Sequence, residues 1–502
     1  MLLKGKYESY RIYSQGGFKM INSTPLYDGL KRYIDENNIN FHMPGHKGGH
    51  GILNIKEKPD FKDNILLIDQ TEVSGLDNLH LPEGIIKEAE ELAARAFRSD
   101  YTYFLVNGTT CGVYSMILGV TNHGDKIIVP RNSHRSVVGA LILGGLWPVY
   151  YEPEVDFEKG IAVSVSLEKI EEAIEKNPDA KAVLVTNPTF YGTCSDIEAI
   201  AELVHKNDMV FLVDEAHGAH LPFSKKLPLN AMDAGADAAV SSTHKTLSSF
   251  TQSSMLHVRK GRVDVEKIEF MLRLTQSTSP SYILMASLDL ARFQMEEHGE
   301  ELIDNLLYMV GDFREKVSQI PDIYCFGKEI IGQHNVVDFD PTKIVINFRN
   351  LGVTGTRIDE ILRKEYKIQV ELSDLYNILA MGTVADVQEN YDVLYNALVD
   401  ISKKHKGQKE IRRIPDIKWE TPYQALNPRE ALYEPMEMID FEKSDGKVSA
   451  EIIAPYPPGI PAIVPGEIIS KSTIENINRM REAGIKINGP RDQKLEKIAV
   501  IK

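Results

Sequence analysis

One lysine stands where its amine could do covalent chemistry. Lys245 ends the run Ser242–Lys245, which lies between a short apolar stretch and a loop rich in Thr and Ser over 246–254. A lysine in a partly desolvated site has a lowered pKa, and its free amine can form a Schiff base with an aldehyde. An ordinary exposed lysine fits the same short motif, so its role depends on its neighbours.

Asp214 is the second candidate, because it follows the apolar strand expected over Met209–Val213. A carboxylate at the end of a buried strand needs a cation or several hydrogen-bond donors, and a protonated pyridine nitrogen would satisfy it. A metal site built from Asp214, His217 and His220 is the alternative. No HExxH helix is present, however, and Gly218 favours a loop.

The segment Asn107–Gly112 lies between an expected strand and an expected helix and carries two hydroxyls, on Thr109 and Thr110. Backbone N–H groups at a helix N-terminus bind phosphate well, and the hydroxyls would add donors. A simple helix cap fits these residues equally well. Neither the GxxxxGK[ST] pattern nor a GxGxxG fingerprint after a strand occurs in the chain.

The remaining candidates are histidines. His42, His46 and His50 recur every four residues, but the prolines and glycines between them forbid a stable helix and favour a structured loop over a metal site. His134 fits either the start of a helix or an aromatic surface for a flat ligand.

The elements that must position these residues alternate between helices and strands over about 77–258. The strands are near-continuous apolar runs, a pattern typical of a parallel sheet covered on both faces. Ligands bind beyond the carboxyl ends of such strands, so the polar segments that follow them are expected near one crevice. Those segments are Asn107–Thr110, Asn132–His134, Asn187–Thr189, Asp214–His217 and Ser242–Lys245.

Beyond about residue 335 the pattern changes to shorter strands, over 345–348 and 368–372, with helices near 357–365 and 391–404. We therefore expect an N-terminal segment over 1–64, a large cofactor-binding domain over 65–335 and a smaller α+β C-terminal region over 336–502. A polar linker is expected near 403–418, followed by a proline-rich segment that begins at Tyr456.

Composition narrows the class of protein. The 502 residues carry 57 Lys and Arg against 72 Asp and Glu, a formal charge of −15, which argues against nucleic acid or an anionic membrane as the partner. Three scattered cysteines (Cys111, Cys194 and Cys325) argue against a disulfide framework and favour a reducing, cytoplasmic setting. The charged first residues do not resemble a secretory signal.

Taken together, a phosphate loop, an aspartate at a strand end and a Ser-x-His-Lys lysine describe a pyridoxal 5'-phosphate site. The chain also resembles the Orn/Lys/Arg decarboxylase family of fold-type I enzymes over roughly 24–490, and within it the short bacterial arginine decarboxylases. The resemblance rests on these segments in fixed order: Phe41–Lys47, Asp77–Pro82, Val106–Thr110, Asn187–Gly192, Asp214–Gly218, Ser242–Lys245, Ser277–Tyr282 and Tyr456–Glu467.

The resemblance implies an α/β fold like that of aspartate aminotransferase and a role for each matched residue. Lys245 would hold the cofactor as a Schiff base, and Asp214 would pair with the pyridine N–H. The other cofactor-binding residues would be His134 against the ring, Thr109, Thr110 and Ser242 at the phosphate, His244 beside the phosphate and the Schiff base, and His217. Family dimers share their sites, so Ser277–Tyr282 would reach a neighbouring subunit in a homodimer or higher oligomer.

The expected reaction is decarboxylation of a small cationic amino acid, foremost arginine to agmatine and carbon dioxide for polyamine synthesis. Lysine or ornithine is the alternative substrate, and a fold-type I aminotransferase or aldolase is the alternative class. Catalysis would fall to Lys245, His244 and Asp214. The acid that binds the substrate side chain stays open between Glu451, Glu467 and others.

Replacing Lys245 by alanine should abolish the visible absorbance of protein-bound pyridoxal phosphate, because only this amine is expected to capture the aldehyde. The measurement is the absorption spectrum of the variant mixed with the cofactor. An unchanged spectrum would mean that another lysine is used.

Overall fold

The computed structural model describes residues 24–52, 55–58, 60–409, 411, 421–456, 459–482 and 484–502. Part of the expected N-terminal segment and part of the expected linker and proline-rich segment therefore lie outside the described residues. Among the residues described, no helix is both long enough and apolar enough to cross a membrane.

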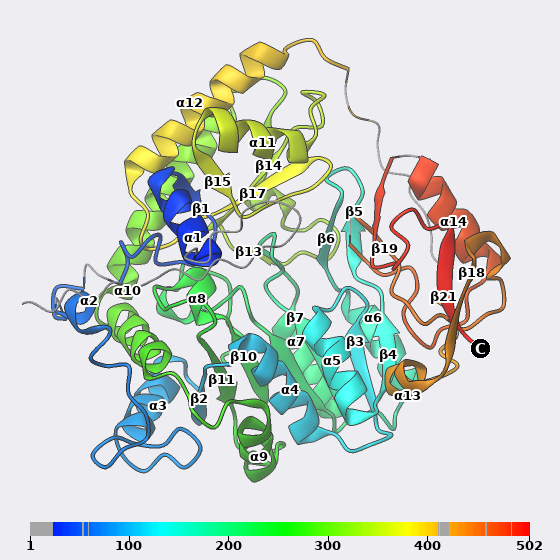
Figure 1. Cartoon of the computed structure of the whole chain (residues 1–502), viewed down its shortest axis with the longest axis horizontal. Coiled ribbons are helices and arrows are strands. Elements are labelled where there is room, and N and C mark those ends of the chain that lie inside the picture. Colours follow the sequence, from blue (N-terminus) through cyan, green and yellow to red (C-terminus); the bar gives the residue numbers. More distant parts are fainter. Residues whose placement is uncertain are drawn as a thin grey trace, which may run out of the picture.

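A seven-stranded sheet forms the centre of the described fold (Figure 1). Its strands, in spatial order, are β2 (Tyr101–Leu105), β11 (Ser254–Val258), β10 (Ala238–Ser241), β9 (Val210–Asp214), β7 (Ala182–Thr186), β3 (Lys126–Pro130) and β4 (Trp147–Tyr151). Strand β11 runs antiparallel to both of its neighbours, and the other pairs are parallel. The mainly parallel sheet expected from the apolar runs is confirmed.

Both faces of this sheet are buried, which explains why its strands read as unbroken apolar runs. Leu184 and Leu212 pack on one side with helices α4, α5 and α9, while Val183 and Val213 pack on the other with α6 and α7. Helices α3 and α10 extend the core beside β2. The bounds are α3 (Ile85–Ala96), α4 (Gly108–Val120), α5 (Arg135–Gly144), α6 (Leu167–Lys176), α7 (Ile197–Lys206), α9 (Val265–Thr275) and α10 (Tyr282–Val317).

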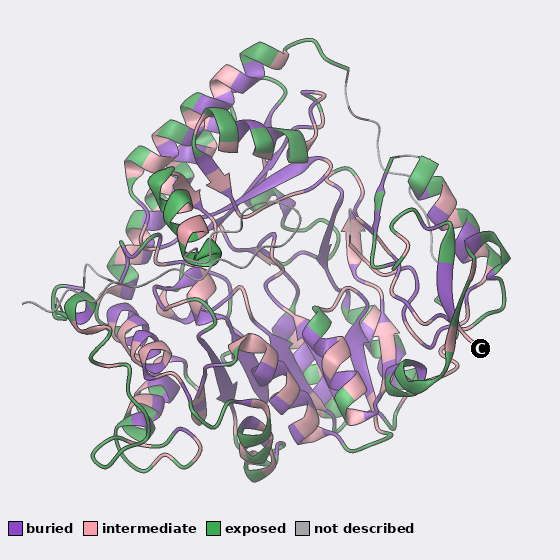
Figure 2. Cartoon of the chain, in the orientation of Figure 1, coloured by how far each residue is buried: buried purple, intermediate pink, exposed green. Residues whose placement is uncertain are grey.

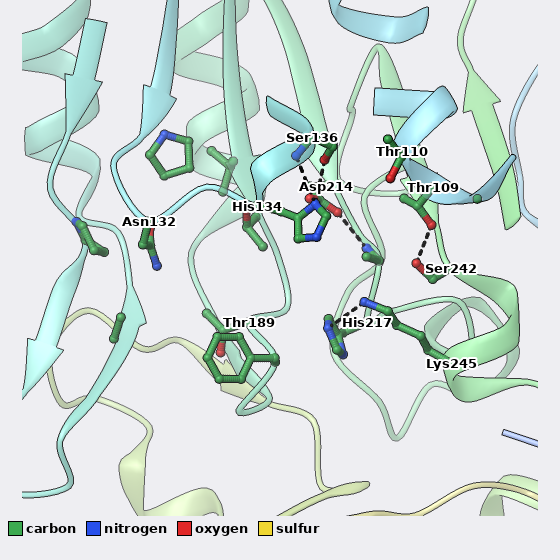
Figure 3. Close-up of a pocket in the computed structure, with 18 of the residues that line it drawn as sticks. Thr109, Thr110, Asn132, His134, Ser136, Thr189, Asp214, His217, Ser242 and Lys245 are labelled. Atoms are coloured by element: carbon green, nitrogen blue, oxygen red, sulfur yellow. Dashed lines mark hydrogen bonds between the residues drawn. The ribbon is translucent and has the colours of Figure 1, made fainter. Parts of the chain in front are cut away.

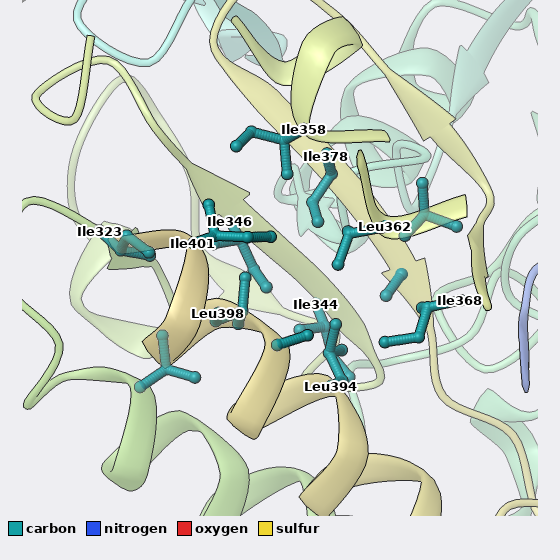
Figure 4. Close-up of a cluster of buried hydrophobic side chains, with 14 of the residues drawn as sticks. Ile323, Ile344, Ile346, Ile358, Leu362, Ile368, Ile378, Leu394, Leu398 and Ile401 are labelled. Atoms are coloured by element: carbon teal, nitrogen blue, oxygen red, sulfur yellow. The ribbon is translucent and has the colours of Figure 1, made fainter. Parts of the chain in front are cut away.

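A four-stranded antiparallel sheet follows, packed against long helices (Figures 1 and 4). Its strands are β12 (Tyr324–Cys325), β14 (Lys343–Asn347), β17 (Asn377–Met381) and β16 (Leu372–Ser373), and its helices are α11 (Gly355–Glu365) and α12 (Gln388–His405). Ile344 and Ile346 of β14 contact the same cluster as Leu394 and Leu398 of α12. The expected polar linker thus begins inside the last turn of α12.

The other elements that precede the C-terminal unit are short. The pairs are β1 (Ile39–Phe41) with β15 (Ile368–Val370), β5 (Glu154–Asp156) with β6 (Ile161–Ser164), and β8 (Thr193–Cys194) with β13 (Asp338–Phe339). Two short helices, α1 (Pro25–Asp35) and α2 (Phe61–Asn64), precede the large sheet. Pair β8–β13 joins the large sheet's loops to the smaller sheet.

Most of the C-terminal elements gather around their own apolar cluster, which includes Ile474 and Ile477, while α13 (Pro428–Tyr433) packs against α5. The other elements of this unit are β18 (Met436–Asp440), β19 (Ala454–Tyr456), α14 (Lys471–Glu482), β20 (Lys486–Asn488) and β21 (Lys497–Ile501). Figure 2 shows buried residues within α14 and β21, whereas no residue of β18 is buried. A buried ion pair between Glu467 and Arg131, which directly follows β3, fastens the unit to the large sheet.

Replacing Leu398 by alanine should lower the free energy of unfolding by about 2–5 kcal/mol, because the side chain is fully buried and leaves a cavity. Val393 on the same helix is 40% exposed, and its replacement by alanine should change the value by no more than about 0.5 kcal/mol. Urea unfolding of both variants provides the comparison. Equal losses would contradict this view of the helix packing.

Candidate active site

A cavity of about 550 Å³ lies where the parallel strands of the large sheet end (Figure 3). The structure brings every site residue expected from the sequence to its lining: Thr109, Thr110, His134, Asp214, His217, Ser242, His244 and Lys245. Each lies at the end of a strand or in the loop or helix start that follows one, the edge at which doubly wound sheets bind ligands.

Lys245 sits in the short helix α8 (Thr243–Thr246), which follows β10. Its Nζ lies 3.0 Å from Nε2 of His217. Burial lowers the pKa of the Lys245 amine, while the negative charges of Asp214 and Glu371 act in the opposite direction and Lys343 adds to the lowering. The structure therefore places a nucleophilic amine at the cavity wall.

Asp214 is the last residue of β9, and its neighbouring strand β10 leads to Lys245. The carboxylate is only 4% exposed, and its Oδ1 accepts a hydrogen bond of 3.2 Å from the Ala216 amide. One backbone donor offers little compensation for a buried carboxylate, so a cationic partner in the cavity would stabilise it.

The N-terminus of α4 opens into the same cavity. Asn107, the residue before the helix, donates its side-chain amide to the Thr275 carbonyl and does not cap the helix. The Thr109 hydroxyl lies 2.5 Å from that of Ser242 and 2.8 Å from that of Ser254. Uncapped helix N–H groups beside three hydroxyls form a suitable phosphate site.

Hydrogen-bond partners indicate which ring nitrogen donates and which accepts in two cavity histidines. The Ser136 amide donates to Nδ1 of His134, which caps α5, so this histidine is both a helix cap and part of the cavity wall. His244 donates from Nδ1 to the Ser253 carbonyl at 2.7 Å. Burial lowers the pKa of His244 to about 4, which leaves its ring neutral at pH 7.

His217 carries an unsatisfied polar atom. Its Nδ1 is buried without a hydrogen-bond partner in the described structure, while its Nε2 meets Lys245. Burial and the nearby charges of Lys245 and Lys343 lower the pKa of His217 well below its ordinary value. The ring is therefore neutral at pH 7 and available to a polar ligand.

The acids considered for the substrate side chain have other partners. Glu467 forms a bidentate pair with Arg131, at 2.6 and 2.8 Å. The carboxylate of Glu451 accepts from the Arg491 and Ala499 amides. Neither lines the cavity, so neither is a free carboxylate there.

The alternative metal ligands also lie apart. His220 contacts Asp340, whereas His217 contacts Lys245. In the loop near the N-terminus, His46 accepts from the Gly49 amide and His42 contacts Tyr33. Within the described residues, no group of three or more His, Cys, Asp or Glu is arranged to hold a metal ion.

Sequence reasoning missed part of the lining. The hairpin β5–β6 supplies an apolar wall through Ala162, Val163 and Val165, and β11 supplies Ser254 behind Thr109. Among the described residues that line the cavity, Asp214 is the only acid. The short apolar run at 161–165 was the available signal for the hairpin wall.

This donor set fits pyridoxal phosphate. The hydroxyls and helix N–H groups match a phosphate, the buried carboxylate of Asp214 matches a protonated pyridine nitrogen, and the amine of Lys245 matches an aldehyde. Nδ1 of His217, which has no hydrogen-bond partner in the described structure, adds a polar atom to the cavity wall, and the ring of His134 adds a flat surface.

Comparison with known proteins agrees with this chemistry. The family model for the major domain of Orn/Lys/Arg decarboxylases matches residues 24–390, and the model for their C-terminal domain matches 412–489. The chain belongs to the Orn/Lys/Arg decarboxylase family. It is a pyridoxal phosphate-dependent decarboxylase, which removes the aminotransferase or aldolase alternative.

Individual relatives cover nearly the whole chain. The arginine decarboxylase of Bacillus subtilis is 42% identical over 96% of this chain and 98% of its own length, and that of Bacillus anthracis is 42% identical over 95% and 97%. The solved structure of lysine decarboxylase A from Pseudomonas aeruginosa superposes with a TM-score of 0.75 at 23% identity, covering 95% of this chain and 80% of that one. The fold expected from the resemblance is confirmed.

Replacing Asp214 by alanine should leave cofactor absorbance intact but lower decarboxylase turnover by about 100-fold or more, because the ring nitrogen loses its counter-charge. Glu215 gives a matched control: it is equally buried, its pKa is raised to about 8 by burial, and it contacts the Ala231 amide away from the cavity. Glu215→Gln should keep near-normal turnover. Near-normal turnover in Asp214→Ala would contradict the assigned role.

Proposed function

We propose that this enzyme converts L-arginine to agmatine and carbon dioxide for polyamine synthesis. The carrying observation is the 42% identity, over nearly the full length of both chains, to relatives named arginine decarboxylases. The identity to the solved lysine decarboxylase is 23%. Lysine and ornithine are therefore the less favoured substrates.

The proposed roles follow from the positions of the side chains. Bound pyridoxal phosphate would supply the electron sink for the pair of electrons released when the carboxylate leaves. Lys245 would hold the cofactor, and Asp214 would keep the proton on its ring nitrogen. Thr109, Thr110 and Ser242 would bind the phosphate.

The histidines have separate proposed tasks. His134 would lie against the ring, and the neutral His217 would hold a proton between its Nε2 and Nζ of Lys245, a contact of 3.0 Å. His244 is neutral and has Nε2 free of its backbone contact, so it or Lys245 could deliver a proton to the substrate carbon. The apolar wall from β6 would exclude water, which strengthens these electrostatic contacts.

The substrate side chain poses a separate requirement. A guanidinium is best bound by carboxylate or carbonyl oxygens in a fork arrangement. Since Asp214 is the only described acid in the cavity and is assigned to the ring nitrogen, the missing acceptor points to a second subunit. A homodimer or higher oligomer with shared sites, in which Ser277–Tyr282 reaches the neighbour, is part of this proposal.

A reducing, cytoplasmic location is also proposed, because Cys111, Cys194 and Cys325 are all free thiols.

The test is a product assay with arginine, lysine and ornithine in the presence of added pyridoxal phosphate. We expect carbon dioxide and agmatine from arginine, with kcat/KM at least about 100-fold above that for the other two, since the sites for a guanidinium and for an ammonium differ in geometry. Cadaverine or putrescine as the faster product would replace arginine with lysine or ornithine.

A further inference from the structure

A buried ion pair lies behind the cavity wall, outside the set of residues assigned above. Lys343 begins β14, and its Nζ lies 3.1 Å from Oδ2 of Asp340. Both side chains are fully buried, and neither lines the cavity. Burying two charges is costly unless their remaining polar atoms are satisfied, so the other contacts of the pair show what it holds.

Those contacts reach the loop that carries His217. Lys343 Nζ donates to the His217 carbonyl at 3.4 Å, and Asp340 Oδ2 lies 3.1 Å from Nε2 of His220. The ion pair therefore contacts this loop at two residues, which are three positions apart. The Thr342 hydroxyl donates to the second oxygen of Asp340 at 2.8 Å and holds the carboxylate in place.

A second loop that lines the cavity also contacts this ion pair. The Asp340 amide donates to the Gly192 carbonyl at 2.7 Å. A Cβ at Gly192 would lie 2.9 Å from Cβ of Lys343, and the φ of +93° at Gly192 also favours glycine. The loop after β7, which supplies Thr189 to the cavity, thus packs directly on the stem of Lys343.

We propose that Lys343, seated by Asp340, is a positioning residue that holds His217 at hydrogen-bonding distance from Lys245. The proposal rests on the assignment of Lys245 as the cofactor-binding amine. Lys343 does not line the cavity itself and acts through the backbone of His217. Its position at the start of β14 lets the smaller sheet set the geometry of a site on the large sheet.

The charge of Lys343 adds an electrostatic contribution. The charged and titratable groups that face the Lys245 amine are His217, His134, His244, Asp214, Glu371 and Lys343. Lys343 lowers the pKa of both Lys245 and His217. Removing its charge should therefore raise the pH midpoint of any titration seen at the cofactor.

The test uses the holoenzyme with the double substitution Lys343→Met and Asp340→Asn, which removes both buried charges and so leaves neither unpaired. We expect kcat to fall about 10- to 100-fold with little change in KM, because His217 is displaced. In the single substitution Lys343→Met, which removes the positive charge alone, the pH midpoint of the bound cofactor's visible absorbance should move upward. Wild-type kcat and an unmoved midpoint would overturn the proposal.

A matched control is Arg292→Met with Asp289→Asn, a pair on α10 with the same three-residue spacing and a buried cation, which neither lines the cavity nor contacts His217. It should leave kcat and the pH midpoint near the wild-type values. A loss equal to that of the Lys343 pair would show a general effect of removing buried charges and would overturn the proposal.

A double-mutant cycle tests the route through His217. His217→Asn should lower kcat, and combining it with the Lys343 and Asp340 substitutions should cause no further loss, because residues acting through one another are not additive. Multiplied losses would overturn the proposal. The pH midpoint requires only bound cofactor, so it stays informative even if the wild-type enzyme releases carbon dioxide from none of the three basic amino acids.

If the double substitution does not yield folded protein, Thr342→Val is the milder variant, since it removes only the hydroxyl donated to Asp340. A smaller fall in kcat with little change in KM is expected, because the ion pair is less firmly held while both charges remain. An unchanged kcat in this variant would overturn the proposal.

Discussion

The burial of a carboxylate at the end of a parallel strand is the constraint on which the rest of the site depends. Asp214 is 4% exposed and receives one backbone hydrogen bond, an arrangement that is costly in an empty apolar site and favourable beside a protonated ring. Apolar side chains and helices cover both faces of the sheet around this strand. Burial also lowers the pKa of Lys245.

The parallel sheet brings the residues of the site together from distant parts of the chain. Because β9 and β10 are adjacent and parallel, the residues that follow them reach the same edge, which places Asp214 and Lys245 together although they are distant in sequence. Helix α4 presents its N-terminus to that edge, beside Ser242. The carboxylate, the amine and the hydroxyls that we expect to bind three parts of one ligand are thus brought to one edge by backbone direction.

Much of this could be predicted from the sequence. The apolar runs before Asn107, Asn132, Asn187 and Asp214 predicted strands whose ends meet, since a strand buried on both faces leaves a clear local signal. The hairpin β5–β6 and the antiparallel strand β11 were missed, because short strands with polar residues such as Ser254 resemble loops. The burial of Lys343 could not be foreseen either, since nothing local distinguishes it from an exposed lysine at the start of a strand.

The contacts of the two glutamates show a similar limit of prediction from sequence. Glu467 and Glu451 lie in a segment matched to the family, which made both plausible partners for a cationic side chain. Their occupation by Arg131 and by backbone amides depends on contacts between distant parts of the chain. Spacing along the sequence carries no information about such contacts.

The ion pair between Arg131 and Glu467 has a consequence for biosynthesis. The partners are 336 residues apart, and Arg131 stands just ahead of Asn132 and His134 on the cavity wall. A ribosome adding about 5–20 residues per second needs roughly 20–70 s to cover that interval. Of its two acidic partners, the guanidinium has only Glu152 during that time, so this wall reaches its final contacts only after residue 467 has been made.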